Sequence, residues 1–291
     1  MSVGLFEAFG AELFRLRRRR SSWIALAATA AVGFLLALAP KVAEQAMAVA
    51  QQVGATGGGG GGTISGFVYL ASGLKGAAVL TGFFVALAAA TSTAGEAAHG
   101  TLRLALARPV QRHHIFLSKA LALGVYLEIL LLAGGLAALA GAALVGDFEA
   151  IAKFGLVKST VTDMVWRSLF ALVLCELSLL GVLGLSMLAG VALSGVGAAL
   201  GTTLGFLVVS TMATIGVESL RPYFFSSFAT SAFETLRAFG LGIDAPRPVW
   251  FGNPTLQDWA DVTFSMTLPA SCAFLFFLLA GVHFCRKDWL T

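Results

Sequence analysis

The chain has 291 residues, of which 58% are hydrophobic and 12% are charged, and its formal net charge is +4. A soluble globular domain carries about 25% charged residues, so this composition excludes a soluble enzyme or binding domain and predicts an integral membrane protein. The basic residues lie at the ends of apolar runs, where they suit anionic lipid head groups and a cytoplasmic partner and do not indicate nucleic acid.

The first residues of the chain, 2–20, are predicted to form an amphipathic basic helix that lies in the membrane interface, within a segment 1–22. The alternative is the charged start of a secretory signal, because Ala37-Leu38-Ala39 resembles a cleavage site. A retained helix is favoured, because the segment is long and amphipathic and Pro40 would directly follow the cut. The apolar residues at helical spacing are Leu5, Phe6, Phe9, Leu13 and Leu16, and the basic ones are Arg15 and the arginines at 17–20.

Six apolar runs follow, and each can cross a bilayer, which takes about 20 residues in a helix. They predict an all-α membrane protein with a single six-span domain over residues 23–291. A polar stretch with a glycine run at 57–62 separates the first two runs and is typical of a flexible linker. The predicted spans are residues 23–39, 76–98, 120–145, 164–189, 195–217 and 262–285.

The distribution of lysine and arginine predicts that both termini are cytoplasmic. Eleven of the 19 fall in the short segments 15–20, 96–119 and 286–287, and the other eight fall in the longer segments opposite. Lysine and arginine favour cytoplasmic loops. We therefore expect a multi-pass protein of the cell (inner or plasma) membrane.

The connection between the second and third spans, residues 96–119, is densely basic. Arg103, Arg108, Arg112 and Lys119 lie in it. Arg108 precedes Pro109, which disfavours helical geometry at Arg108 and can open a new helix. The connection is predicted as helix, break and helix at the cytoplasmic membrane surface.

This connection resembles that of type-2 ATP-binding-cassette (ABC) exporter permeases. It departs from the family at Ala105, where a second leucine is common. The resemblance implies that the connection rests on a separate cytoplasmic ATPase, which would hold ATP and Mg²⁺, and that the permease works as a homodimer or as a heterodimer with a similar permease. The matching residues are Glu96, Gly100, Thr101, Leu102, Leu104, Arg108, Pro109, Arg112, Ile115 and Lys119.

No phosphate-binding GxxxxGK[ST] loop occurs in the sequence. The chain is therefore expected to be no enzyme by itself and to bind no cofactor. Three cysteines in or at the end of apolar runs indicate no disulfide framework, and four histidines near the cytoplasmic edge indicate no metal site. These residues are Cys175, Cys272, Cys285, His99, His113, His114 and His283.

Glu96 comes just before the cytoplasmic end of the second span. A carboxylate there opposes the helix dipole and needs a cation nearby. Arg103, seven residues on, is on the same face if the helix continues.

Residues 218–262, before the last span, mix aromatic residues, prolines and charges. The resemblance implies a pair of short re-entrant helices here, and an aromatic belt at the outer interface is the overlapping alternative. The aromatic residues are Phe224, Phe225, Phe228, Phe233, Phe239, Trp250, Phe251 and Trp259.

Gly197, Gly201 and Gly205 repeat at four-residue spacing in the fifth span. Such a strip lets two helices approach closely. The contact is either within the subunit or between subunits. The resemblance favours the second, because the second and fifth spans of the family tend to line the dimer interface.

Glu128 and Glu176 are predicted to lie at a similar depth in the third and fourth spans. Carboxyl groups in spans usually face the bundle interior, where they mark a pathway or form a hydrogen-bonded pair. The pair keeps open an ion-coupled secondary transporter as an alternative function. A second alternative is a mechanotransmitting membrane anchor of an envelope complex. No motif identifies a substrate.

Overall fold

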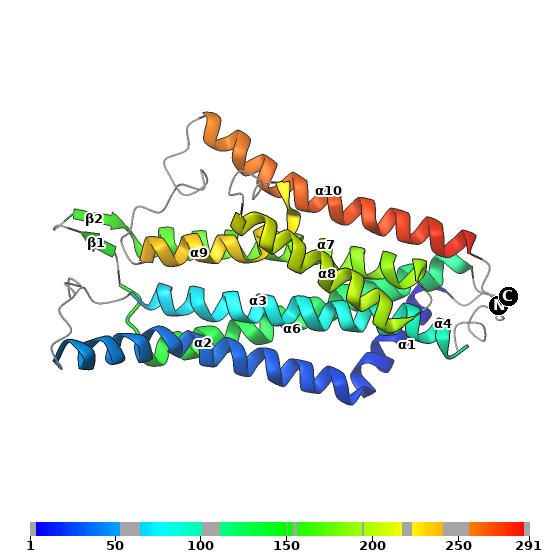
Figure 1. The fold of residues 1–291 in the computed structure, drawn as a ribbon, viewed down its shortest axis with the longest axis horizontal. Coiled ribbons are helices and arrows are strands. Elements are labelled where there is room, and N and C mark those ends of the chain that lie inside the picture. Colours follow the sequence, from blue (N-terminus) through cyan, green and yellow to red (C-terminus); the bar gives the residue numbers. More distant parts are fainter. Residues whose placement is uncertain are drawn as a thin grey trace.

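The computed structural model describes residues 4–52, 65–100, 111–149, 151–153, 156–193, 195–216, 223–240 and 256–287. Over these residues the chain is a bundle of long helices that run side by side (Figure 1). The helices that are long and apolar enough to cross a membrane are Arg20–Val42, Gly66–Ala98, Arg112–Val145, Val161–Ala192, Val196–Ala213 and Thr263–Arg286. The predicted helical membrane fold with six candidate spans is confirmed, and the second span begins ten residues before its predicted start at residue 76.

The described elements follow the chain as a helix ahead of the first span, the spans themselves, and short elements between them. They are α1 (Leu5–Arg18), α2 (Arg20–Gln52), α3 (Gly66–Ala90), the π-helical turn η1 (Thr91–Gly95), α4 (Glu96–Ala98), α6 (Arg112–Val145), β1 (Ile151–Lys153), β2 (Leu156–Ser159), α7 (Val161–Ala192), α8 (Val196–Gly216), the 3₁₀ turn η3 (Phe225–Ser227), α9 (Phe228–Gly240) and α10 (Leu256–Arg286).

Side chains cap two of the spans where they begin. Thr160 accepts a hydrogen bond from the Asp163 backbone, and the Asp163 side chain accepts one from the Thr160 backbone, so α7 begins with a capping box. Ser65 accepts a bond from the Phe67 backbone at the start of α3. The antiparallel hairpin of β1 and β2 precedes α7, between the predicted third and fourth spans.

Helices α2, α3 and α6 pack closely because small residues meet between them. A Cβ added at Gly33 would lie 2.6 Å from the carbonyl oxygen of Gly134, and one added at Gly73 would lie 2.5 Å from the carbonyl oxygen of Gly33. A Cβ at Gly134 would lie 2.6 Å from the Ala77 side chain. Glycine at these positions lets the backbones approach, and close contact is what drives helix association in lipid.

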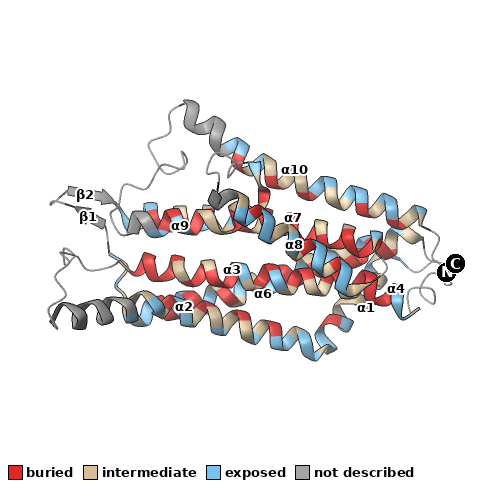
Figure 2. Ribbon diagram, viewed as in Figure 1, coloured by how far each residue is buried: buried red, intermediate tan, exposed pale blue. Residues whose placement is uncertain are grey.

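Helices α3 and α7 form the centre of the bundle. Buried residues are concentrated on them, whereas exposed residues are frequent along α2 and α10 (Figure 2). Helix α10 packs mainly on α7, and α9 lies beside α3 and α7. An ion pair of 2.7 Å between Lys75 Nζ and Glu234 Oε1 joins α3 to α9. Large side chains that are fully buried in this bundle include Leu123, Leu127, Leu130, Met164, Leu174, Leu183 and Met187.

Helix α1, α4 and the last turn of α10 lie at one end of the bundle, called here the α1 end (Figure 1). Whether this end is cytoplasmic stays a prediction. The resemblance implies two re-entrant helices within residues 218–262. The structure describes η3 and α9 in this segment, and residues 241–255 lie outside the described residues. The re-entrant arrangement stays a prediction, and so does the boundary between the interfacial segment 1–22 and the six-span domain 23–291.

Candidate functional site

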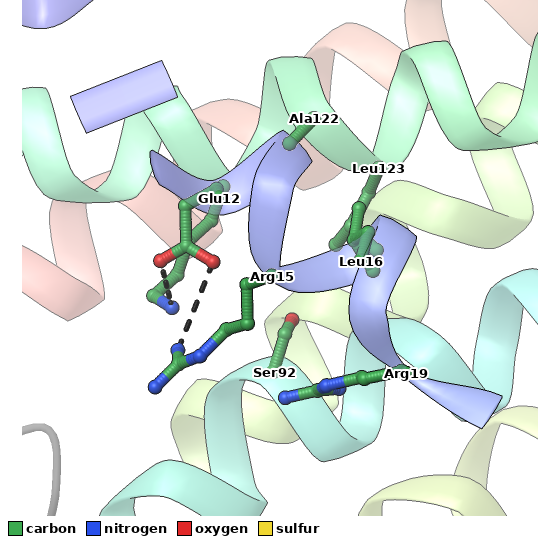
Figure 3. Close-up of a pocket in the computed structure, with 8 residues that line it drawn as sticks. Glu12, Arg15, Leu16, Arg19, Ser92, Ala122 and Leu123 are labelled. Atoms are coloured by element: carbon green, nitrogen blue, oxygen red, sulfur yellow. Dashed lines mark hydrogen bonds and ion pairs between the residues drawn. The ribbon is translucent and has the colours of Figure 1, made fainter. Parts of the chain in front are cut away.

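A cluster of charged side chains joins three elements at the α1 end. The amino group of Lys119, in α6, lies 2.8 Å from Glu12 Oε1 of α1 and 2.8 Å from Glu96 Oε2 of α4. Arg15 Nη1 donates to Glu96 Oε1, and Arg19 Nη2 lies 4.0 Å from that oxygen. We call Glu12, Arg15, Arg19, Glu96 and Lys119 the junction cluster. Figure 3 shows the side chains of Glu12 and Arg15, which come from α1, and of Arg19, which directly follows α1.

The centre of the junction cluster is withdrawn from solvent. The side chain of Lys119 is 2% exposed and that of Glu96 is 8% exposed. A buried ammonium group is very costly unless a carboxylate pairs with it, and the same holds for a buried carboxylate. Lys119 therefore holds both acids near it, and α1 is attached to the ends of α3 and α6 through charge as well as through buried Leu16.

The π-helical turn η1 directly precedes Glu96. The hydroxyl groups of Thr91, Ser92 and Thr93 donate to the carbonyl oxygens of the preceding turn, at 2.8 to 3.0 Å. A π turn holds one residue more than an α turn, and one residue corresponds to about 100° of helix rotation. Glu96 would therefore face a different direction if the same sequence were regular α-helix, so η1 sets its direction toward Lys119.

Space for η1 comes from a glycine of the neighbouring span. A Cβ added at Gly190 in α7 would overlap the Thr93 hydroxyl group. Thr93 itself is 1% exposed. The π turn is thus packed directly against α7, and only glycine fits opposite it.

Two further basic residues bond to the ends of helices at the α1 end. Arg112 Nη1 donates to the carbonyl oxygens of Cys285 (3.3 Å) and Lys287 (3.2 Å), where α10 ends. Lys287 Nζ donates to the carbonyl oxygen of Val191 in the last turn of α7, at 2.6 Å. Cations are favourable at helix C-termini because they satisfy carbonyl groups and are attracted to the negative end of the helix dipole. These bonds tie α6, α10 and α7 together.

The structure describes part of the predicted ATPase-coupling set. Gly100 follows α4 with a φ of 70°, a left-handed conformation that suits glycine after a helix end. Arg112 donates to backbone carbonyl oxygens at the end of α10. Residues Thr101, Leu102, Arg103, Leu104, Arg108 and Pro109 lie outside the described residues.

Glu96 has the cation that its place near a helix end requires. The partners are Lys119 and Arg15, whereas the sequence suggested Arg103. The prediction that Lys119 belongs to a basic surface group is wrong, because Lys119 is buried. One signal for this buried position is present in the sequence, because Lys119 directly precedes a long apolar run.

Sequence reasoning missed the contribution of α1 to the site. The sequence places residues 2–20 in an interfacial helix, yet Glu12 points to Lys119 and Arg15 points to Glu96. The available signal was Glu12, an acid three residues before Arg15 in a helix whose second half is otherwise rich in arginine.

The two carboxyl groups in the spans are brought together. The side chain of Glu128 in α6 interacts with that of Glu176 in α7. Carboxyl groups in spans form such pairs or mark a pathway, so both alternatives stay open and a transport role stays a proposal.

The glycine strip of α8 does not contact another helix of this chain in the described residues. A Cβ added at Gly197, Gly201 or Gly205 would meet nothing within 4 Å. Of the two contacts that the sequence left open, the described residues do not form the one within the subunit, because α8 turns this strip outward. A contact with a second subunit stays a proposal.

Comparison with known families identifies the chain. A family model described as ABC-2 family transporter protein matches residues 8–201, about two thirds of the chain. This chain belongs to the ABC-2 transporter family. The match spans α1 to the start of α8 and so includes all five residues of the junction cluster. No curated protein matches the ABC-2 chain.

Family membership and the six apolar helices together make this ABC-2 protein a multi-pass membrane component of an ABC transporter. They account for the lack of a nucleotide-binding loop in its sequence, because in such a transporter another component supplies the ATPase.

Proposed function

We propose that the chain is the permease subunit of an ABC-type exporter in the inner or plasma membrane. A separate cytoplasmic ATPase would bind ATP and Mg²⁺, and its closure would press on residues 99–116. The observation that carries this proposal is the junction cluster, because it lies at both ends of that segment: Glu96 precedes it and Lys119 follows it.

The arrangement of the α1 end supports a path for the force. A push on the segment reaches α3 through Glu96, α6 through Lys119, and α1 through Glu12 and Arg15. Arg112 and Lys287 extend the connection to α10 and α7. Rigid elements linked by paired charges move together, which is what alternating access or substrate expulsion requires.

The basic composition of the α1 end supports its cytoplasmic orientation. The outward glycine strip of α8 supports assembly as a homodimer or as a heterodimer with a similar permease. Both features agree with an exporter in which two permease subunits meet two ATPases on the cytoplasmic face.

Charge reversal at Arg108 tests the ATPase contact. The tagged chain is purified from membranes of its own cells, and the co-purifying ATPase is measured by vanadate-sensitive ATP hydrolysis and mass spectrometry. We expect Arg108→Glu to lower ATPase recovery and to leave membrane insertion unchanged. Arg108 is preferred to Arg112, because reversing Arg112 would also break its bonds to α10.

The control is Arg237→Glu, which reverses an exposed arginine of α9. It should leave ATPase recovery at the wild-type level. Wild-type recovery with the Arg108→Glu variant would contradict the proposed contact, and a purified chain without any ATPase would contradict the exporter.

The Glu128–Glu176 pair favours one second candidate, an ion-coupled transporter in which the pair carries a proton or cation. The two candidates differ in the energy source. Export that continues after ATP is removed, and that stops when the proton gradient is collapsed, would favour the second candidate. A mechanotransmitting anchor would hydrolyse ATP through its partner without moving a substrate.

A further inference from the structure

The arginines at the end of α1 divide into two sets. Arg15 and Arg19 approach Glu96 in the junction cluster. Arg17, Arg18 and Arg20 are exposed, and no carboxylate of the described residues lies within 4 Å of them. We call these three the outer arginines. The sequence alone shows a run of basic residues, and the fold separates those that are paired from those that are not.

The outer arginines lie beside a surface that suits lipid. Arg20 begins the first candidate span, and Trp23 and Ile24 follow within about one turn, 58% and 65% exposed. The indole nitrogen of Trp23 donates to the carbonyl oxygen of Arg17 at 2.9 Å, which fixes the indole at the corner between α1 and α2. Tryptophan and arginine at the end of a span are typical of the head-group region.

An aromatic side chain of α1 contacts one of the outer arginines. The guanidinium carbon of Arg18 lies 4.7 Å from the ring centroid of Phe14, and Phe14 is itself exposed. A cation over a ring is held in place by the ring quadrupole. Arg18 is therefore positioned next to an apolar group that a bilayer can cover and a soluble partner would have to bury.

We propose that the outer arginines bind the phosphate groups of anionic phospholipids in the leaflet at the α1 end. Guanidinium groups pair with phosphate through two parallel hydrogen bonds. Net positive charge favours anionic over zwitterionic lipid, and the exposed Phe14 and Trp23 would enter the acyl boundary. Helix α1 then contacts lipid on one face and the junction cluster on the other.

This proposal is independent of the exporter proposal, because it needs neither an ATPase nor a substrate. It has one consequence for either function. The position of α1 would depend on the lipid composition, and Glu12 and Arg15 would pass that dependence to Lys119 and Glu96.

Lipid titration of the purified full chain tests the site. The protein in detergent is titrated with phosphatidylglycerol or phosphatidylcholine, and bound lipid is counted by native mass spectrometry. We expect tighter binding of phosphatidylglycerol, and an apparent dissociation constant about fivefold weaker for each outer arginine changed to glutamine. The preference should diminish as ionic strength rises, because salt screens exposed charges.

Three comparisons keep the test specific. The triple variant R17K/R18K/R20K keeps the charge and should keep most of the preference. Arg286→Gln, an exposed arginine at the same end on α10, should leave it unchanged. If the variant with all three outer arginines changed to glutamine does not insert into the membrane, the three single Arg→Gln variants are compared with the wild-type chain instead.

Equal binding of the two lipids by the wild-type chain would overturn the proposal, as would unchanged phosphatidylglycerol binding after loss of all three arginines. Displacement of the lipid by glycerol phosphate at equal concentration would also overturn it, because the site would then recognise free phosphate. Loss of ATPase recovery with lipid preference intact would assign the outer arginines to the ATPase instead.

Discussion

Lys119 is the residue on which the attachment of α1 depends. Its side chain is nearly inaccessible, and it contacts two carboxylates from different elements. Surface ion pairs contribute little to stability, whereas removing one partner of a buried pair leaves an uncompensated charge. A lysine side chain is therefore expected to contribute much more to stability at Lys119 than at exposed Lys75.

We predict that Lys119→Met destabilises the chain by up to about 3–5 kcal/mol, because Glu96 stays buried, loses its ammonium partner and keeps only the guanidinium groups of Arg15 and Arg19. The matched control is Lys75→Met, whose pair with Glu234 is 42% and 43% exposed; it should cost less than about 1 kcal/mol. The measurement is the unfolding midpoint of the purified protein in detergent.

Adding Glu96→Gln to Lys119→Met should recover part of the loss, since the buried charge is then removed. Equal destabilisation by Lys119→Met and Lys75→Met would show that the junction cluster is not buried in the membrane-embedded protein.

At the scale of elements, η1 determines which way the end of the second span faces. The apolar run 76–98 predicted one continuous helix, and its composition does not distinguish a π turn from an α turn. The hydroxyl groups at 91–93 donate to carbonyl oxygens of the preceding turn, and the missing side chain of Gly190 leaves room for the π turn against α7.

We predict that inserting one alanine after Gly95 is more harmful than deleting Ala94. The insertion rotates Glu96 by about 100° away from Lys119. The deletion converts η1 to a regular α turn and keeps Glu96 in its present direction. Chemical denaturation of both variants compares their stability, and an insertion that is tolerated as well as the deletion would refute this role of η1.

At the scale of the whole molecule, glycines on different helices have different roles. Gly33 lies against the backbone of another helix of the same chain, whereas Gly201 faces outward. Sequence spacing pointed to Gly201, because GxxxG is recognised within one helix. The contact at Gly33 involves single glycines on separate helices, which only the tertiary structure brings together.

We predict that Gly33→Leu lowers the stability of the subunit by about 1–3 kcal/mol, as overpacking does. Gly201→Leu should leave that stability unchanged and weaken association between subunits. Detergent unfolding measures the first effect, and crosslinking through Gly201→Cys, in a background without Cys175, Cys272 and Cys285, measures the second. A Gly201→Cys chain that stays uncrosslinked in native membranes would rule out the dimer contact there.

The amino-acid sequence by itself determined the class of protein, the six spans, their order and the family, because each follows from local composition or from a contiguous motif. Apolar runs of sufficient length must be helical in lipid, where every backbone group needs an internal partner. The motif that began at Glu96 pointed to the ABC-2 family through ten residues in one stretch.

The tertiary structure alone decided which charged and small residues meet. Glu12, Glu96 and Lys119 are far apart in the chain, and their pairing depends on how α1 crosses the ends of α3 and α6. The division of the arginines into paired and outer sets and the outward direction of Gly201 depend on packing in the same way. Local sequence sets which residues can be helical, but the cost of burying a charge or a void is fixed only when helices from distant segments come into contact.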